Sequence, residues 1–287
     1  MGADDDTPVQ VVRKPVDVTS RKPLDVTYLR SAVIRPGGLW RALEVTERTG
    51  STNADLLARA RDGAPEGVVL AAEEQSAGRG RMGRTWVSPP RAALMFSLLV
   101  RPAAVPPARR GWLPLLAGVA VAEAVTATTG VTTRLKWPND LLAGDAKLAG
   151  ILAEAAGDAI VVGVGLNVST EQAELPPPGP GALPATSLRV AGAPATDRAP
   201  LLLAILAGFE RWYQAWRRAG GDPDRSGLRA GYTACSGTIG RRVRAELPGR
   251  QLLSGLAVGV DSDGRLLVRA SPGTEVPVAA ADVVHLR

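Results

Sequence analysis

The pattern of apolar and polar positions divides this chain into an α/β body followed by a short all-β segment. Uninterrupted apolar runs bounded by turn residues predict buried strands, and longer runs with apolar residues at helical spacing predict helices. Strands are predicted at residues 43–45, 67–72, 94–100, 131–137 and 159–168. Helices are predicted at residues 24–34, 51–60, 112–129 and 201–219.

After about residue 235 the sequence changes to short alternating segments separated by turns, which predicts a small β-barrel. The first 35 residues mix charge and proline with few large apolar groups, so we expect a loose start. We therefore expect three parts: a tail and lead-in at 1–40, a main domain at 41–235 and a C-terminal domain at 236–287.

Composition limits the chemistry that this chain can perform. Its single cysteine, Cys235, excludes an internal disulfide framework, and its single histidine, His285, excludes zinc sites and catalytic triads built on histidine. No signal peptide is evident at the N-terminus. The long apolar stretch 111–131 contains Pro114 and Glu123, which indicates a buried helix rather than a membrane span. We expect a cytoplasmic protein that makes no membrane contact.

Residues 75–89 form a segment rich in glycine and arginine. Glycine lets the backbone adopt positive φ and bring its amides around an anion, and guanidinium groups match carboxylate and phosphate. From Gln75 to Ala122 there is no Asp or Glu, and the net charge of the chain is +6. The arginines in this stretch are Arg79, Arg81, Arg84, Arg91, Arg101, Arg109 and Arg110. The segment is therefore interpreted as an anion-binding loop.

Two other interpretations of this loop compete with that one. The spacing of Gly78, Gly80 and Gly83 matches the dinucleotide-binding fingerprint, but that fingerprint needs a helix opening at the loop and an acid about twenty residues later. Neither is present, because Pro89 and Pro90 follow too closely for a helix. A solvated Arg/Gly segment that binds RNA would fit the composition, yet the pattern occurs once, between two apolar runs.

Polar residues at the ends of the predicted strands complete the set of candidates. Ser51, Thr52 and Asn53 are all good helix N-caps, but one cap suffices, so the others are available to a ligand. Lys136 and Lys147 are the only lysines after Lys22, which favours a functional role for Lys147 in particular. Two further polar positions, Asn139-Asp140 and Asn167, have turn chemistry as their simpler explanation.

Taken together, these motifs resemble those of biotin protein ligases. They are Gln75 with loop 78–84 and Trp86, residues 136–140, residues 147–154 and residues 163–167, in that family's order and spacing. The resemblance implies an α+β fold: a catalytic domain related to class II aminoacyl-tRNA synthetases, with a mixed, largely antiparallel sheet, and a C-terminal SH3-like domain. It also implies that biotin and ATP form biotinyl-5′-AMP and pyrophosphate, after which biotin passes to one lysine of a biotin carboxyl carrier domain, such as that of acetyl-CoA carboxylase.

The resemblance also assigns roles to single residues. Biotin binding would involve Ser51, Thr52, Asn53, Gln75, Arg79, Gly80, Arg81 and Lys147. ATP or adenylate binding would involve Gly78, Arg81, Arg84, Trp86 and Asn167. The catalytic group would be Lys147, Arg79, Arg81 and Lys136, which bring two anionic substrates together. Mg²⁺ would accompany the phosphates, with Asp140 as a weak candidate for its outer shell.

The sequence departs from the family pattern in two respects, and two rival functions stay open. Met82 occupies a position that is often basic in the family, so the loop carries slightly less charge. The segment before Ser51 is too short for the winged-helix DNA-binding domain of bifunctional members, which predicts a monofunctional ligase without specific DNA binding, as a monomer or weak homodimer. A lipoate ligase or octanoyl transferase is the nearest rival, and a basic nucleic-acid-binding protein is the second.

Overall fold

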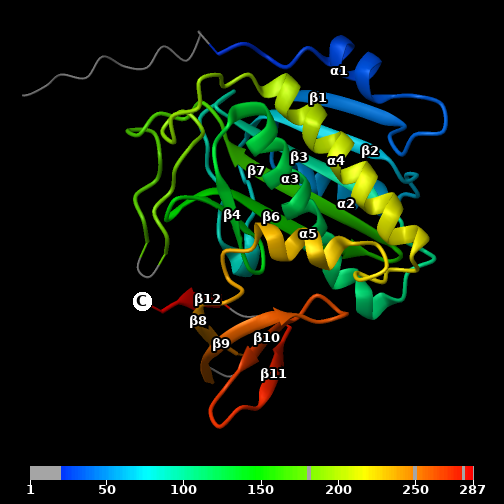
Figure 1. Cartoon of the computed structure of the whole chain (residues 1–287). Coiled ribbons are helices and arrows are strands. Elements are labelled where there is room, and N and C mark those ends of the chain that lie inside the picture. The colour runs from blue at the N-terminus through cyan, green and yellow to red at the C-terminus, as the bar shows by residue number, and fades with distance from the viewer. Residues whose placement is uncertain (1–20, 180–181, 248–250, 280–281, 287) are drawn as a thin grey trace, which may run out of the picture.

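The computed structural model describes residues 21–179, 182–247, 251–279 and 282–286 (Figure 1). Of the first 35 residues, for which a loose start was expected, residues 1–20 lie outside these ranges. The short helix expected in the lead-in is present as α1 (Val26–Val33), which begins after Asp25, whose side chain accepts a hydrogen bond from the Tyr28 amide.

A seven-stranded sheet forms the centre of the main body, in the order β1-β2-β3-β7-β6-β5-β4. β1 and β2 are parallel, and every other neighbouring pair is antiparallel, which confirms the expected mixed sheet. Its strands are β1 (Ala42–Thr49), β2 (Val68–Gln75), β3 (Ala93–Val100), β4 (Thr133–Lys136), β5 (Asp140–Ala143), β6 (Ala146–Ala156) and β7 (Ala159–Asn167).

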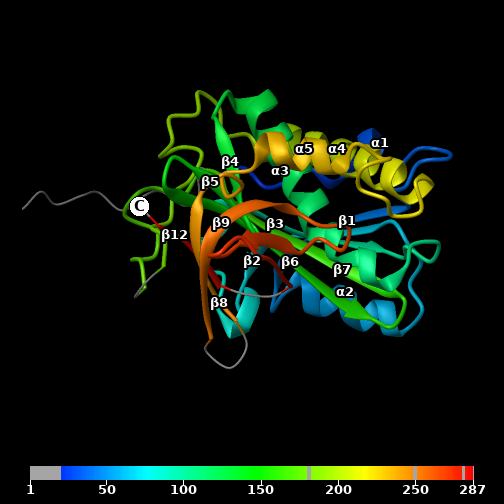
Figure 2. The same ribbon diagram turned by 60° about the horizontal axis from the view of Figure 1, so that its bottom comes forward.

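Helices cover both faces of this sheet, as Figure 2 shows from below. α3 (Trp112–Thr129) and α4 (Arg198–Arg218) lie on one face, and α2 (Thr52–Arg61) lies on the other. All eight residues of β3 are consequently buried: Leu94, Phe96, Leu98 and Val100 join the core under α3, and Leu99 joins the core under α2. Burial on both faces explains why the central strands are continuous apolar runs.

The helix predicted at residues 112–129 has these bounds in the structure and ends at Gly130, which adopts a φ of 70°. Among the described residues, the segment Pro107–Thr129, which contains it, is the one helix long and apolar enough to cross a membrane, and most of it is buried inside the fold. Its packing against α4 and the sheet agrees with the interpretation as a core helix. The aromatic residues of α4 also join this core, with Phe209 and Tyr213 stacked at 5.8 Å between ring centroids.

The C-terminal segment forms a separate antiparallel sheet in the order β11-β10-β9-β8-β12, which confirms the predicted change to β structure. Its strands are β8 (Arg242–Glu246), β9 (Leu252–Val260), β10 (Leu266–Arg269), β11 (Glu275–Val278) and β12 (Asp282–His285). It follows α5 (Leu228–Cys235), a helix that the sequence pattern does not predict.

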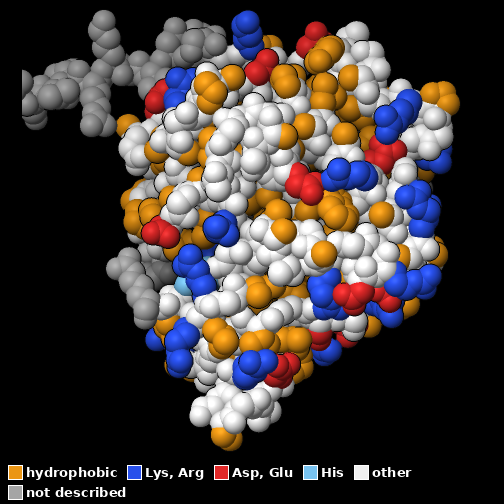
Figure 3. Space-filling view, in the orientation of Figure 1, with side chains coloured by type: hydrophobic (Ala, Val, Ile, Leu, Met, Phe, Trp, Pro, Cys, Tyr) orange, Lys and Arg blue, Asp and Glu red, His pale blue; other side chains and the backbone are white. Residues whose placement is uncertain are grey.

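The charged surface seen in Figure 3 is dispersed, with basic side chains scattered among apolar and uncharged ones rather than gathered in one continuous patch. Ion pairs account for part of this arrangement around α4. Arg211 lies 2.5 Å from Glu123, and Arg217 lies 2.7 Å from Glu66. The positive net charge therefore does not produce a single basic surface on this face.

Candidate functional site

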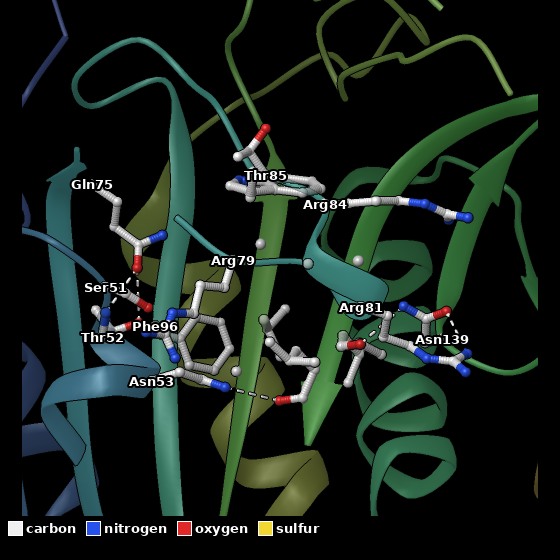
Figure 4. A pocket seen from close by; sticks show the side chains of 18 of the residues that line it. Ser51, Thr52, Asn53, Gln75, Arg79, Arg81, Arg84, Thr85, Phe96 and Asn139 are labelled. Carbon is white, nitrogen blue, oxygen red and sulfur yellow. Dashed lines mark hydrogen bonds between the residues drawn. The ribbon is translucent and has the colours of Figure 1, made fainter. Parts of the chain in front are cut away.

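A cavity of about 100 Å³ lies between the glycine-arginine loop (residues 75–89) and the face of the sheet that carries α2 (Figure 4). Most of the predicted site residues line it, although they come from segments far apart in the sequence. The lining residues are Ser51, Thr52, Asn53, Gln75, Arg79, Gly80, Arg81, Arg84, Thr85, Trp86, Phe96, Asn139, Lys147, Gly150, Ile151, Leu152, Gly163, Val164 and Gly165.

A polar cluster at the start of α2 forms one end of the cavity. The Thr52 amide and hydroxyl both donate to Gln75 Oε1, at 2.8 Å and 3.2 Å. The parallel pairing of β1 with β2, which sets Thr49 opposite Gln75, brings these residues together. Ser51 is the N-cap residue, but its side chain makes no capping hydrogen bond. Its hydroxyl is therefore not committed to the helix.

Asn53 is held at the floor of this cluster by three side-chain hydrogen bonds. Its Nδ2 donates to Leu152 O at 3.2 Å and to Glu154 Oε2 at 2.8 Å, while its Oδ1 accepts from Ser97 Oγ at 2.6 Å. Gly163 makes room for it, because a Cβ there would lie 2.8 Å from Asn53 Cγ. These contacts satisfy the Asn53 amide within the protein, so it fixes the floor of the cavity.

Ser97 and Glu154 are structural partners of this cluster that the sequence reasoning did not single out. Ser97 Oγ also lies 2.7 Å from Thr52 Oγ1, so its one hydroxyl proton is shared between Asn53 and Thr52, and Ser97 is fully buried in the middle of β3. A lone hydroxyl inside an apolar strand was the available signal, since a buried polar group needs a nearby hydrogen-bond partner. Glu154 belongs to the 147–154 motif, but its side-chain contacts depend on the pairing of β6 with β7, which the sequence alone did not reveal.

Trp86 lies flat against two glycines of the sheet. A Cβ on Gly165 would lie 2.5 Å from Trp86 Cε2, and one on Gly150 would lie 3.4 Å from its Cζ3. Gly165 in β7 therefore accommodates an indole ring. Trp86 Nε1 is buried and has no hydrogen-bond partner among the described residues, which leaves a buried donor for a ligand to satisfy.

The glycine-arginine loop is closed by its own backbone. The Trp86 amide donates to Gly78 O at 2.9 Å, and the Gly80 amide donates to Arg84 O at 2.7 Å. Gly78 must be glycine, because a Cβ there would overlap the carbonyl oxygen of Trp86. Met82, at the tip, adopts a φ of 55° and is 72% exposed. The loop is thus a formed turn rather than an extended linker.

Basic side chains of this loop reach towards acceptors on β6 and on the turn before β5. Arg79 Nη1 lies 3.8 Å from Glu154 Oε1, and Arg81 Nη1 donates to Asn139 Oδ1 at 3.3 Å. Asn139 is itself held by Ile151, through Nδ2 to Ile151 O at 3.1 Å. Figure 4 places Arg81 and Asn139 at the opposite end of the cavity from Ser51, Thr52 and Gln75. The cavity therefore has a polar end, where Arg79 also approaches Glu154 beside Asn53, and a cationic end that contains Arg81.

Lys147 adds a further cation to this arrangement. Its Nζ lies 2.6 Å from Asp140 Oδ1, in a pair whose side chains are 28% and 14% exposed. Its backbone is fixed on both sides, since its amide donates to Pro184 O and its carbonyl accepts from the Thr186 amide. The favoured functional lysine thus faces the cavity.

The described ranges contain no group of three or more His, Cys, Asp or Glu residues arranged to hold a metal ion. Asp140, the weak candidate for magnesium, is already paired with the Lys147 ammonium. This donor set does not fit a resident magnesium ion, which prefers several oxygen ligands in octahedral geometry. Asp140 instead provides the counter-charge of a cavity lysine.

Four predicted site residues are absent from the lining of the cavity: Gly78, Lys136, Asp140 and Asn167. Asn167 is buried at the end of β7, where its Nδ2 donates to Thr186 O at 2.9 Å. Lys136 ends β4, close to His285 of the C-terminal sheet. Burial, followed by the positive charges of Lys136 and Arg241, lowers the pKa of His285 to about 4. The structure thus associates Lys136 with the contact between the two sheets.

Comparison with known proteins agrees with this geometry. Residues 45–170 match the biotin/lipoate A/B protein ligase family, and residues 238–286 match the biotin protein ligase C-terminal domain. The chain is 48% identical over 271 residues to the biotin--[acetyl-CoA-carboxylase] ligase of Mycobacterium tuberculosis, covering 93% of this chain and 97% of the relative. It is 33% identical over 245 residues to the bifunctional ligase/repressor BirA of Bacillus subtilis, covering 84% and 72%.

Solved structures support the same relationship. The biotin protein ligase of Aquifex aeolicus in complex with biotin and ATP superimposes with a TM-score of 0.69 and 26% identity, covering 86% of this chain and 100% of that chain. A mutant of the Aquifex aeolicus enzyme in complex with biotin gives a TM-score of 0.70 at the same identity, covering 85% and 98%. The sequence relationship and the shared fold show that this chain is a ligase and belongs to the biotin protein ligase family.

Proposed function

We propose that this chain activates biotin with ATP, forming biotinyl-5′-AMP and pyrophosphate, and then transfers biotin to a lysine of a biotin carboxyl carrier domain. The observation that carries this proposal is the polarity of the cavity, with the hydroxyl and amide groups of Ser51, Thr52 and Gln75 at one end and the Arg81 guanidinium at the other. A ligand with a neutral polar ring and an anionic tail has matching chemistry.

The biotin ring would bind at the end formed by Ser51, Thr52 and Gln75. A ureido ring offers two N–H donors and one carbonyl acceptor, and these residues carry hydroxyl and amide groups that complement both. Asn53 would act mainly through position, because its amide is already bonded to Leu152, Glu154 and Ser97. A buried polar site of this type discriminates strongly against a ligand that lacks the matching groups.

The carboxylate of biotin and the phosphates of ATP would meet at the cationic end. Both groups are negatively charged, so their approach needs concentrated positive charge, which Arg79, Arg81 and Lys147 supply. The biotin carboxylate attacks the α-phosphorus, the bond to the bridging oxygen breaks, and pyrophosphate leaves with the electron pair. The substrate itself is the nucleophile, which agrees with a chain containing one cysteine and one histidine.

The nucleotide would lie between the loop and the sheet. Trp86 and Gly78 would form part of its wall, Arg84 and Lys136 would add charge nearby, and Asn167 would contribute from the end of β7. Magnesium would enter with ATP as the substrate complex, consistent with the poor fit of Asp140 to a resident ion.

The remaining assignments follow from the same proposal. Residues 41–235 would form the catalytic domain, with a class II synthetase-like sheet, and residues 236–287 an SH3-like domain. In the second step, the ε-amine of the carrier lysine attacks the acyl carbon, AMP leaves, and the amine loses a proton. The enzyme would encounter ATP and the carrier domain in the cytoplasm.

Pyrophosphate exchange tests the first step. Purified protein with Mg-ATP, labelled pyrophosphate and biotin should exchange label into ATP before any carrier is added. Lipoate is the informative competitor because the matched family includes lipoate ligases and because a dithiolane ring lacks N–H and carbonyl groups. Exchange with lipoate but not with biotin would show that the polar end binds the ring of lipoate rather than that of biotin. Exchange with neither compound, together with salt-sensitive RNA binding, would favour the nucleic-acid-binding alternative.

The second step needs its own assay. A carrier domain with its acceptor lysine should become biotinylated, and the same domain with that lysine replaced by arginine should not. Exchange without transfer to the intact carrier domain would confine the proposal to adenylation.

A further inference from the structure

Two buried tryptophans of the main body hold one turn of the C-terminal sheet. Trp112, the first residue of α3, donates its indole N–H to Asp261 O and to Ser262 O, both at 3.1 Å. Trp137, which follows β4, donates its indole N–H to Gly264 O at 3.2 Å. Both side chains are at most 1% exposed, so water cannot replace these hydrogen bonds without local opening.

Two facing glycines allow this turn to approach closely. A Cβ on Gly264 would lie 2.8 Å from the carbonyl carbon of Gly111, and one on Gly111 would overlap the carbonyl oxygen of Asp263. Gly264 also has a φ of 85°, which a side chain would disfavour. Turn 261–264 is therefore built to fit against the start of α3.

Trp137 differs from Trp112 in its neighbours along the chain. Asn139 and Asp140 follow it after Pro138, and they contact Arg81 and Lys147 of the cavity. The position of the Trp137 peptide thus influences two of the acceptors that orient the cationic end. Trp112 begins a core helix instead and lines neither cavity of this region.

The linker into the C-terminal sheet fixes Trp137 a second time. The Trp137 amide donates to Thr238 Oγ1 at 3.0 Å, and Thr238 is fully buried. One residue earlier, the Gly237 amide donates to Leu135 O at 2.8 Å. Thr238 Oγ1 also lies 3.0 Å from His285 Nε2 of β12. The end of β4 is therefore attached to both the linker and the last strand.

A second cavity, of about 430 Å³, lies where these contacts meet. Trp137 and Gly264 line it together with Arg81 and Asn139, which also line the first cavity. Arg265 enters it from the C-terminal sheet, held by Asp261 at 2.7 Å and by Asp263 at 3.3 Å. The tryptophan contact thus forms a wall of the space next to the cationic end.

We propose that Trp137 and Thr238 are positioning residues through which the C-terminal sheet orders the cationic end of the cavity. By fixing the peptide before Asn139 and Asp140, they hold the acceptors that aim Arg81 and Lys147. The inference deepens the proposed function, because it makes the C-terminal sheet part of the nucleotide half of the site. The polar end is held by bonds among α2, β2, β3 and β6, so its ring pocket does not depend on this contact.

The test compares two substitutions of the same chemical kind. Trp137→Phe and Trp112→Phe each remove one indole N–H bonded to turn 261–264 and leave a similar space in a buried site. In pyrophosphate exchange, Trp137→Phe should lower kcat/KM for ATP by about tenfold or more, because small displacements of positioned groups are costly. In Trp137→Phe the KM for biotin should rise less than the KM for ATP, because Arg81 and Lys147 would contact only the carboxylate of biotin while its ring is held at the polar end. Trp112→Phe should retain both ATP and biotin kinetics within about twofold, since its contact lies away from the acceptors.

Thr238→Val provides a second test if Trp137→Phe does not fold. It removes the hydroxyl that binds the Trp137 amide while nearly preserving shape, and Thr238→Ser restores the hydroxyl. Thr238→Val should reproduce the selective loss in ATP kinetics, and Thr238→Ser should recover most of it.

Each result separates the alternatives. Equal losses in Trp137→Phe and Trp112→Phe, or equal effects on ATP and biotin, would show that the contact only holds the two sheets together, and would overturn the positioning role. Unchanged kinetics in both Trp137→Phe and Thr238→Val would also overturn it. Absence of exchange in the unsubstituted protein would overturn the proposed function and, with it, this inference.

Discussion

Two glycines on one face of β7 should control the two ends of the cavity separately. Gly163 faces Asn53 and Gly165 faces Trp86, two residues further along the same strand. Neither has a positive φ, so alanine fits the backbone at both positions. Gly163→Ala and Gly165→Ala therefore add the same methyl group to the same strand but push against different parts of the site.

At Gly165 the added methyl would lie 2.5 Å from Trp86 Cε2 and 2.8 Å from its Cδ2 and Nε1. Since carbon atoms pack at about 3.5–4.0 Å, the indole must retreat by about 1 Å. Overpacking of this kind costs about 1–3 kcal/mol. If that cost falls on the complex with nucleotide, the KM for ATP should rise by about fivefold to 150-fold.

At Gly163 the methyl would lie 2.8 Å from Asn53 Cγ and closer to its Oδ1, so the amide must move off the strand. That movement strains its hydrogen bonds to Leu152, Glu154 and Ser97. At a net value of about 1 kcal/mol for each bond, the loss is about 2–3 kcal/mol. It should appear as a higher KM for biotin, because Asn53 supports Thr52 and Ser51 at the ring end.

Pyrophosphate exchange at varied biotin and varied ATP measures both constants in each variant. Gly259→Ala in β9 is the matched control, because a Cβ there meets nothing within 4 Å and its φ is not positive. It should leave both constants unchanged. The reasoning would be refuted if Gly163→Ala and Gly165→Ala raised the same constant, or if neither raised either one while both proteins stayed folded.

Three further predictions concern charge. Lys147→Ala and Arg81→Ala should each depress biotin-dependent exchange by about a hundredfold or more, because each removes a cation from the meeting point of two anions; a loss of thermal stability with intact exchange would contradict both assignments. Glu73→Gln should lower the free energy of unfolding, measured in urea melts, by about 3–5 kcal/mol. The substitution leaves the buried Arg198 guanidinium, whose Nη1 lies 2.6 Å from Glu73 Oε2, without its counter-charge. A cost below about 1 kcal/mol would show that this buried pair contributes little. His285 has a pKa of about 4 in the fold, below its unfolded value of 6.5, so the unfolded chain binds more protons between these pH values. The free energy of unfolding should therefore fall as the pH drops from 7 to 4, and it should fall less steeply in His285→Asn. Equal pH dependence in the two proteins would contradict this prediction.

Local pattern was sufficient to predict much of this fold. The helix at residues 112–129 is delimited by its apolar composition and by Gly130, and the central strands are delimited by continuous apolar runs. β5 and β6 were not predicted, because glycine, alanine and charged residues in 140–156 give no clear period. α5 was missed for a related reason, since its short sequence carries few buried apolar residues.

Site residues were predictable where their type was unusual for its position. Three capping residues in succession and two isolated lysines identified Ser51 and Lys147, both of which line the cavity. Their partners could not be found in this way, because the contacts of Ser97 and Glu154 depend on which strands become neighbours. The shape of the cavity likewise depends on how the elements pack. Gly163 and Gly165 leave room for side chains only because Asn53 and Trp86 lie opposite them, and the sequence alone does not show these contacts.

Lys147 and Arg79 are paired with carboxylates to different degrees. Lys147 Nζ lies 2.6 Å from Asp140 Oδ1, whereas Arg79 Nη1 lies 3.8 Å from Glu154 Oε1. Because an anionic ligand must compete with these carboxylates, Arg79 can turn to a phosphate or carboxylate at lower cost than Lys147. Binding energy would thus come first from Arg79, and Lys147 would exchange its partner only when the two anionic groups have been brought together.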